Sequence, residues 1–287
     1  LTHIYLYQNE WIKAEQAATQ LISDGTYQLI TERFGIEKSK AGTPWTDLFL
    51  DGNINRWEGN TETIWALQTG NQYTVKGIGQ YLKCCWLNSY QNVNGLTYSL
   101  EYWQRGKCIF RPTEFYLNLF DQEDDRGSEF AIKRIWKYNN AAYIKSQKDK
   151  GTPLKQLVNG SYVEVEVGDT VVISDETTAN WLWPQPTKFM DVFGTSLSED
   201  YSDKDIPVMR LAETYLFRAE ARFRQGNPSG AANDINVLRR RAHAPEISSA
   251  SIDIDLILDE RARELMGEVN RRFTLIRTGK LIERNQL

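Results

Sequence analysis

The chain has 287 residues, of which 41% are hydrophobic and 25% charged, and its formal net charge is −4. This length allows one large domain or two small ones with a sizeable core. The acidic balance argues against a nucleic-acid-binding protein, because it would repel phosphate. No run of 18 apolar residues is present, so the sequence predicts no membrane-spanning helix.

The first 25 residues predict a helical hairpin. A first helix ends near Gln8, and Asn9-Glu10 turns the chain. Apolar residues then recur at positions 11, 14, 18, 21 and 22, which is the spacing of one helix face. Asp24-Gly25 ends this second helix.

Helical periodicity disappears over most of the segment 26–206. A short strand is predicted at 63–68, a short helix from Pro112 to about Phe120, and a β-hairpin at 163–173 that turns at Gly168-Asp169. The segment 70–107 is long, aromatic and rich in Asn and Gln, and connections of this length inside a domain are usually functional or disordered. The sequence therefore predicts a loop-rich, partly β middle region.

No metal or cofactor is expected. Cys84, Cys85 and Cys108 form no C-x-x-C motif and the two histidines are far apart, which argues against zinc. A disulfide from Cys84 or Cys85 to Cys108 stays open. The acidic stretch 121–125 lacks the spacing of an EF-hand loop, which favours a solvated turn over a calcium site.

The segment 207–287 predicts three amphipathic helices. Apolar residues form one stripe at 208–223, a facing stripe at 231–242 and a third at 254–265. Gly226 ends the first helix, Asn227 caps the second and Pro228 takes its first position. Helix pairs with facing alanines are typical of tetratricopeptide (TPR) repeats. On the helix surfaces, i,i+4 spacing predicts the ion pairs Asp259–Arg263 and Glu220–Arg224.

Three segments in this region resemble the SusD/RagB family in the same order. PVMRLAETYLFRAEA at 207–221 is similar to the family's P-x-x-R-x-A-E-x-Y-L-x-x-A-E-A helix, and ANDINVLRRRA at 232–242 is similar to the helix that follows. LDERAREL at 258–265 with RRFTLIR at 271–277 resembles the closing element. Looser similarities at 5–14, 60–65, 112–116 and 124–126 extend the resemblance over nearly the whole chain.

The resemblance implies a mainly α fold, a SusD-like α/α superhelix of TPR-like hairpins. Its parts would be a hairpin remnant at 1–25, the loop-rich ligand-binding region at 26–206 and C-terminal helices at 207–287, all within one domain whose N-terminal part is missing here. The implied function is binding of a glycan at the cell surface and delivery to a SusC-type TonB-dependent transporter. The implied location is the outer membrane, through an N-terminal lipid anchor that this chain does not contain.

Aromatic residues in the polar segments are the candidate ligand contacts. A flat ring can stack on the C–H face of a pyranose, and nearby amides and charges can fix the hydroxyls. The polar candidates are Asn88, Gln91, Asn92, Asn94 and Arg105. The aromatic candidates are Trp57, Trp86, Tyr90, Tyr98, Tyr102, Trp103, Trp181 and Trp183. Periodicity instead places Trp11, Trp45 and Trp65 in the core.

No enzyme signature is present. The sequence contains no H-E-x-x-H, G-x-S-x-G, P-loop or G-x-G-x-x-G motif, and we expect no catalytic residues and no enzymatic activity. The alternative function is a TPR-type scaffold that binds a protein or peptide. Exposed aromatics on the loops favour the glycan, and an open concave groove between the helices favours the peptide.

Overall fold

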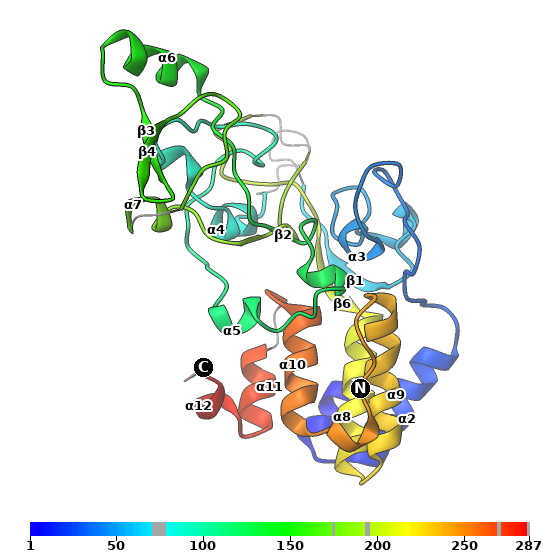
Figure 1. Ribbon diagram of the computed structural model, residues 1–287. Coiled ribbons are helices and arrows are strands. Elements are labelled where there is room, and N and C mark those ends of the chain that lie inside the picture. The colour runs from blue at the N-terminus through cyan, green and yellow to red at the C-terminus, as the bar shows by residue number, and fades with distance from the viewer. Residues whose placement is uncertain (71–78, 174–175, 193–195, 269–270, 286–287) are drawn as a thin grey trace. The chain divides into compact units, whose positions relative to one another are not determined.

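The computed structural model describes every residue except 71–78, 174–175, 193–195, 269–270 and 286–287 (Figure 1). The described residues form two compact units, and each is assembled from separate stretches of the chain. Unit 1 contains Leu1–Gln68, Thr113–Ala131 and Asp205–Leu287, and unit 2 contains Thr69–Pro112 and Ile132–Lys204. The expected middle region, 26–206, therefore contributes to both units.

Unit 1 is mainly helical. The hairpins α1–α2 and α8–α9 pack on each other through α2 and α8, and α10 packs on the other side of the second hairpin (Figure 1). This confirms the expected helical fold. The helices of unit 1 are α1 (Thr2–Tyr7), α2 (Trp11–Ser23), α3 (Pro44–Asp47), α5 (Glu114–Leu117), α8 (Leu211–Arg224), α9 (Pro228–Arg241), α10 (Ile254–Leu265), α11 (Arg271–Arg277) and α12 (Leu281–Arg284), with 3-10 turns at Arg56–Glu58, Asp125–Gly127 and Ser249–Ser251.

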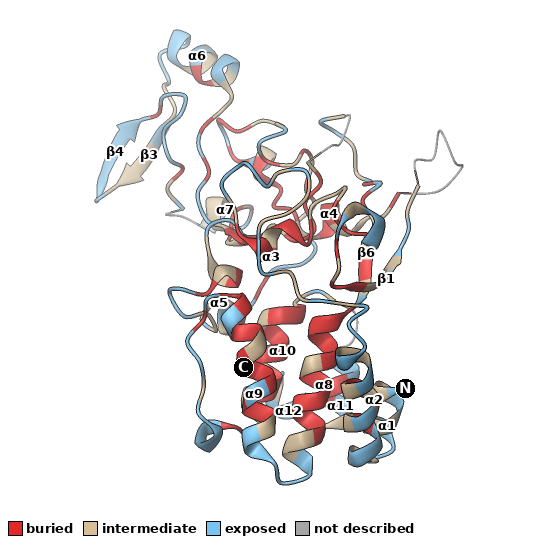
Figure 2. Cartoon of the chain, turned by 90° about the vertical axis from the view of Figure 1, so that its right-hand side faces the viewer, coloured by how far each residue is buried: buried red, intermediate tan, exposed pale blue. Residues whose placement is uncertain are grey.

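The α8–α9 hairpin follows directly from its turn residues and its alanines. Gly226 takes a left-handed φ of 75°, and the Asn227 side chain accepts a hydrogen bond of 2.8 Å from the Gly230 amide. The facing stripes of the two helices are buried, and their alanines allow a close approach. Figure 2 shows this burial along α8, α9 and α10. The core consists of Ala212, Leu216, Ala219, Ala231, Ile235, Leu238, Ile252, Ile257 and Leu265.

A two-stranded antiparallel sheet in unit 1 pairs β1 (Thr63–Leu67) with β6 (Ile206–Arg210). Strand β1 agrees with the strand predicted at 63–68 to within one residue, but the placement of Trp65 in the core is wrong, because its side chain is 53% exposed. Trp45 is buried at 2% exposure as predicted. Trp11 is half-buried and packs against the cluster formed by Leu6, Ala14, Phe217 and Ala221.

A network of buried ion pairs holds unit 1 together. The carboxylate of Glu264 lies 2.6 Å from Arg241, 2.9 Å from Arg210 and 3.2 Å from Arg126. All four side chains are at most 1% exposed. Burial alone would raise the pKa of Glu264, but the three guanidinium groups outweigh it and hold the pKa far below its usual value. The network continues to Glu62, Asp121, Asp124, Arg239, Glu260, Arg263 and Glu268, so it joins all three stretches of the unit.

Three expectations about charged residues are wrong. Asp259 pairs with Arg284, and Glu220 pairs with Arg277, so neither uses the predicted i,i+4 partner. These side chains reach a neighbouring helix, where burial strengthens the pairing. The acidic stretch 121–125 is not simply a solvated turn, because Asp124 is 1% exposed and lies 2.8 Å from Arg126.

Unit 2 has little regular structure and an aromatic core. Side chains of Tyr90, Tyr102, Trp136, Tyr138 and Leu182 are buried together with smaller apolar residues. The elements of unit 2 are α4 (Leu82–Trp86), α6 (Ala141–Asp149), α7 (Glu176–Ala179), a 3-10 turn at Tyr90–Asn92, and two antiparallel pairs, β2 (Ile132–Lys133) with β5 (Gln185–Pro186) and β3 (Lys155–Val158) with β4 (Ser161–Glu164).

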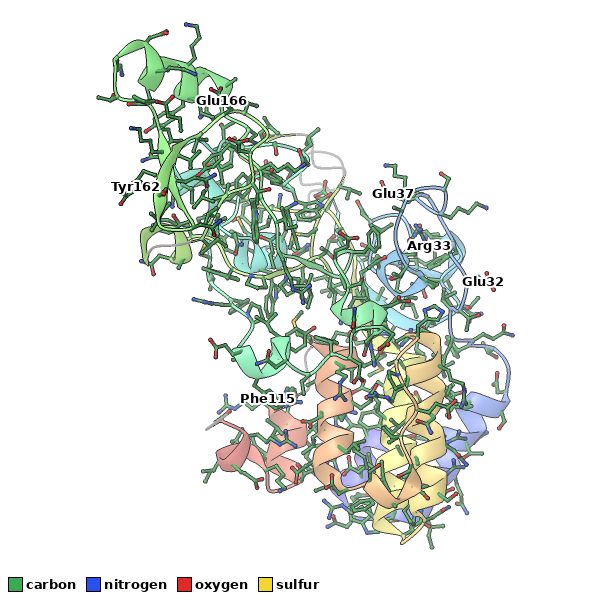
Figure 3. All side chains as sticks on the ribbon, viewed as in Figure 1. Glu32, Arg33, Glu37, Phe115, Tyr162 and Glu166 are labelled. Atoms are coloured by element: carbon green, nitrogen blue, oxygen red, sulfur yellow. The ribbon has the colours of Figure 1, made fainter. Side chains whose placement is uncertain are left out.

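The predicted hairpin has a different turn from the one expected. Strands β3 and β4 are joined by Asn159-Gly160, whose φ angles of 50° and 81° are both left-handed. Asn-Gly is the residue pair that two-residue hairpin turns favour, so the turn predicted at Gly168-Asp169 is wrong. Tyr162 lies on strand β4 of this hairpin (Figure 3).

No helix among the described residues is both long and apolar enough to span a bilayer. All three cysteines carry free thiols, so the disulfide to Cys108 does not form. Burial raises the pKa of Cys84 to about 12 and also raises that of Cys108. These thiols are therefore protonated at neutral pH.

Candidate functional site

Trp86 ends helix α4 and lies half-buried in an aromatic cluster of unit 2. Its ring stacks on that of Phe189, with the centroids 5.3 Å apart and the planes inclined by 10°, and Phe110 tilts against it at 5.3 Å. Phe110 is 43% exposed and its neighbour Ile109 is 53% exposed. The cluster therefore has an apolar edge at the surface, of the kind that stacks on a sugar ring.

Trp103 sits on a turn of unusual backbone geometry. Trp103 and Gln104 both adopt left-handed conformations, with φ angles of 56° and 72°, which cost a non-glycine residue of the order of 1 kcal/mol or more. Gln104 is buried and accepts a hydrogen bond of 2.6 Å from Lys83 Nζ, which fixes the turn. The Trp103 ring is half-buried, with Lys133 Nζ 5.6 Å from its centroid.

A charged and aromatic cluster lies around Asp200. Lys107 Nζ is 2.5 Å from Asp200 Oδ2 and Arg105 Nε is 3.4 Å from Oδ1. Tyr81 and Tyr201 approach each other at 5.6 Å, and Lys107 lies over the Tyr81 ring. Burial would raise the pKa of Asp200, but the two cations lower it. Of this cluster only Arg105 is a polar candidate predicted from the sequence, because Asp200 is about a hundred residues away in the chain.

Three of the eight aromatic candidates belong to the core of unit 2. Tyr90, Tyr102 and Trp183 are at most 5% exposed. The Tyr102 hydroxyl donates to the Lys137 carbonyl and accepts from the Lys137 amide, both at 2.8 Å, and the Tyr90 hydroxyl donates to the Gln104 carbonyl. Their rings have no free face for a ligand in this conformation. The polar side chains of Asn88 and Gln91, which lie near Tyr90 in the sequence, donate hydrogen bonds to backbone carbonyls.

The remaining candidates keep part of their surface. Tyr98 and Trp181 are half-buried and pack against the same core, and Trp57 is 72% exposed in unit 1. Among the polar candidates, Asn88 is buried and donates 2.8 Å to the Trp183 carbonyl, and Gln91 donates 3.2 Å to the Gly106 carbonyl. Asn92 and Asn94 are exposed. The candidate segment 73–105 also includes residues 73–78, which lie outside the described residues.

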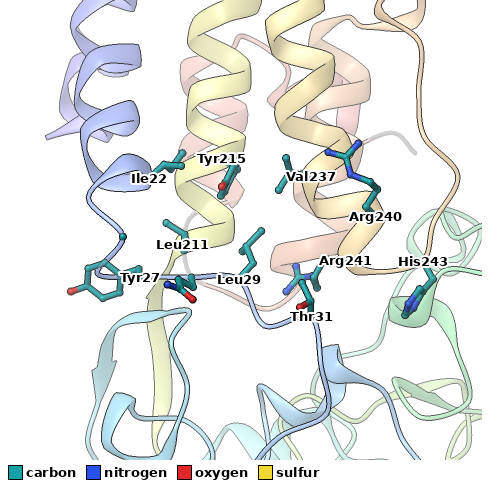
Figure 4. Close-up of a pocket in the computed structure, with 12 residues that line it drawn as sticks. Ile22, Tyr27, Leu29, Thr31, Leu211, Tyr215, Val237, Arg240, Arg241 and His243 are labelled. Atoms are coloured by element: carbon teal, nitrogen blue, oxygen red, sulfur yellow. The ribbon is translucent and has the colours of Figure 1, made fainter.

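No group of three or more His, Cys, Asp or Glu side chains among the described residues is arranged to hold a metal ion. In unit 1, a cavity of about 510 Å³ lies beside the ends of α2, α8 and α9 (Figure 4). Its arginines are already paired, Arg240 with Glu246 at 3.0 Å and Arg241 with Glu264 at 2.6 Å, and His243 Nδ1 lies 2.8 Å from the Asp125 carboxylate. The rest of its wall is largely apolar and tyrosine-lined.

The sequence matches known proteins over different lengths. The SusD family model matches residues 61–286. The starch-binding protein SusD of Bacteroides thetaiotaomicron is 51% identical over 79 residues, which are 28% of this chain and 14% of that protein. SusD-like protein P38 of Formosa agariphila is 24% identical over 98% of this chain and 51% of its own length. The chain thus spans about half the length of this curated relative.

Solved structures show the same fold. Surface glycan-binding protein A of Bacteroides thetaiotaomicron, in complex with laminarihexaose, superimposes with a TM-score of 0.61 at 21% identity, covering 97% of this chain and 53% of that one. A SusD superfamily protein of Bacteroides vulgatus has a TM-score of 0.60 at 19% identity, covering all of this chain and 52% of that one. At these identities the likeness is one of fold. Because the family model spans most of its length, the chain belongs to the SusD family.

Proposed function

We propose that the chain forms the glycan-binding part of a cell-surface protein that delivers its ligand to a SusC-type TonB-dependent transporter at the outer membrane. Membership of the SusD family supports this, as do the starch-binding name of one relative and the laminarihexaose complex of a protein with the same fold.

The observation that carries the glycan proposal is the pair of left-handed residues at Trp103 and Gln104. A bulky residue in this conformation is costly, and such strain is found most often at functional sites. The turn is stabilised by the Trp103 amide, which donates 3.0 Å to the Leu100 carbonyl, and by the Gln104 amide, which donates 2.9 Å to the Ser99 carbonyl. Full burial would remove the apolar surface of the Trp103 ring from water, yet the ring stays half-buried.

Four further aromatics are kept as proposed ligand contacts. Trp86 offers the partly exposed cluster with Phe110, and Tyr98, Trp181 and Trp57 retain accessible surface. The charges around Asp200 would add directional hydrogen bonds to hydroxyl groups, since Arg105 and Lys107 donate and the carboxylate accepts. Tyr90, Tyr102 and Trp183 are left out because they are buried.

We expect no catalytic activity on polysaccharides. A glycosidase needs two carboxylates a defined distance apart, and the Asp200 carboxylate is engaged by two cations. The purified full-length protein should release no reducing sugar above the buffer background. Release above that background would contradict this part of the proposal.

The alternative, a TPR-type scaffold for a protein or peptide, is favoured by the apolar, tyrosine-lined cavity in unit 1. A glycan array and affinity gels containing starch or laminarin, run with the full-length protein, separate the two functions. We expect binding to at least one glycan and co-purification of the transporter. No glycan binding, together with capture of a peptide that Tyr215→Ala abolishes, would favour the scaffold.

A further inference from the structure

A second cavity, of about 290 Å³, lies in unit 2 against the β3–β4 hairpin. The hairpin forms one wall and the loop around Asn92–Asn94 forms another. The residues that line it are Asn92, Val93, Asn94, Tyr138, Leu154, Lys155, Gln156, Leu157, Tyr162, Val172 and Thr178. None of them is among the aromatic candidates discussed above.

Gln156 locks the wall of this cavity in place. Its side-chain oxygen accepts hydrogen bonds from the Tyr138 hydroxyl at 3.3 Å and the Val172 amide at 2.9 Å. Its side-chain nitrogen donates 3.1 Å to the Thr170 carbonyl. Together with the apolar side chains of Val93, Leu154, Leu157 and Val172, these bonds give a preformed hollow with a mixed polar and apolar lining.

The polar side chains at the rim are not used by the fold. Asn92, Asn94 and Lys155 are exposed, and the Tyr162 side chain is 74% exposed. Within the described part of the chain, none of these four side chains has a hydrogen-bond or ion-pair partner. A two-residue Asn-Gly turn fixes the register that sets Tyr162 opposite Leu157, so both side chains lie on one face of the hairpin.

We propose that this cavity is an additional subsite for one neutral pyranose unit of the glycan, an inference that rests on the function proposed above. The exposed Tyr162 ring offers a face for the C–H groups of the sugar. The two asparagine amides can each donate and accept, as hydroxyl recognition requires. The volume is at the lower end for small-molecule pockets, which suits a single ring. Lys155, the one cation among the described residues that line the cavity, can donate to a hydroxyl.

The test compares four full-length proteins, the wild type, Tyr162→Ala, Asn94→Ala and Val163→Ala. Val163 neighbours Tyr162 on the same strand, is 47% exposed and does not line the cavity, so its variant controls for changes in the hairpin. Affinities for maltohexaose, laminarihexaose, starch and laminarin are measured by calorimetry and affinity gels. We expect Tyr162→Ala to weaken binding about 5- to 20-fold, by analogy with aromatic stacking elsewhere, and Asn94→Ala about 3- to 10-fold, as for one hydrogen bond.

Each outcome decides a separate point. If Tyr162→Ala also lowers the melting temperature, Asn94→Ala decides the question, because Asn94 lies outside the hairpin. Wild-type affinity in both variants, or an equal loss in Val163→Ala, overturns the subsite while glycan binding stands. A wild type that binds no glycan, on the array or among these four, overturns the proposed function and the subsite together.

Discussion

The two units are stabilised by different kinds of interaction. Unit 1 buries whole charges, since Arg126 and Arg210 both pair with Glu264 and all three side chains are fully inaccessible. Unit 2 buries aromatic rings, and its tyrosine hydroxyls bond the backbone, as Tyr102 does with Lys137. Buried charges need partners in fixed positions. The core of unit 2 is built from aromatic rings on loops, and aromatic side chains outside that core stay half-exposed. The first arrangement suits a scaffold and the second suits a binding surface.

The largest expected effect on the free energy of unfolding is that of Glu264→Ala in unit 1. It leaves three buried guanidinium groups without their shared carboxylate, and we expect a loss of about 3–5 kcal/mol in the free energy of unfolding. Denaturant titration measures this loss. As a control, Glu246→Ala removes one partner of an exposed pair with Arg240 and should cost less than about 1 kcal/mol. Equal effects of the two variants would show that the network does not stabilise unit 1.

Acid should destabilise unit 1 through the same network. The pKa values of Glu264 and Glu260 are raised by burial but lowered further by their arginine partners, so both lie below the ordinary value of about 4.5. A carboxyl group whose pKa is lower in the folded than in the unfolded protein stabilises the fold above its unfolded-state pKa. This stabilisation is lost as the pH falls below the unfolded-state pKa and towards the folded-state pKa. Asp234 acts in the opposite sense, because burial raises its pKa.

Unfolding free energies measured between pH 6 and pH 3 test the sign of this effect. The wild type should lose up to about 2 kcal/mol more than Glu264→Gln, which has one fewer carboxylate to protonate. Parallel pH profiles for the two proteins would contradict the role of Glu264.

Tyr102→Phe should have a smaller effect, confined to unit 2. It removes the hydroxyl that bonds both the amide and the carbonyl of Lys137, and the loss of these two hydrogen bonds should cost about 1–2 kcal/mol. Tyr162→Phe is the matched control, because the ring of Tyr162 is 74% exposed. A change of melting temperature shared by both variants would argue against a specific bond at Lys137.

Periodic apolar residues and turn residues predicted α1, α2, α8, α9 and α10 of unit 1, but not the two short helices α11 and α12 that follow them. Gly226, Asn227 and Pro228 predicted the turn between α8 and α9 because each acts locally. The partners of Glu220 and Asp259 were not predictable, since Arg277 and Arg284 reach them from other helices. The alternation of apolar and polar residues shows that one face of a strand is apolar, but it does not show whether another layer of the protein covers that face. The predicted core position of Trp65 is wrong for this reason.

The candidate site was harder to predict than the fold. An aromatic and polar composition does not separate Tyr90, which is buried, from Trp103, which is half-buried nearby. That difference depends on the left-handed turn at Trp103, and non-glycine residues give no sequence signal for it. The cavity beside Tyr162 does have a local sequence signal, the Asn159-Gly160 pair that joins β3 and β4. The hairpin predicted to turn at Gly168-Asp169 does not make use of that signal.

The most direct test of the account is one variant measured twice. Affinity for the bound glycan and thermal stability are determined for full-length Trp103→Ala, with Trp65→Ala, a 53% exposed tryptophan of unit 1, as the control. We predict that Trp103→Ala weakens binding by about 1–3 kcal/mol, roughly 5- to 150-fold, with a nearly unchanged melting temperature, and that Trp65→Ala changes neither. Intact binding with a loss of about 3–5 kcal/mol in stability would make Trp103 a core residue and contradict the account.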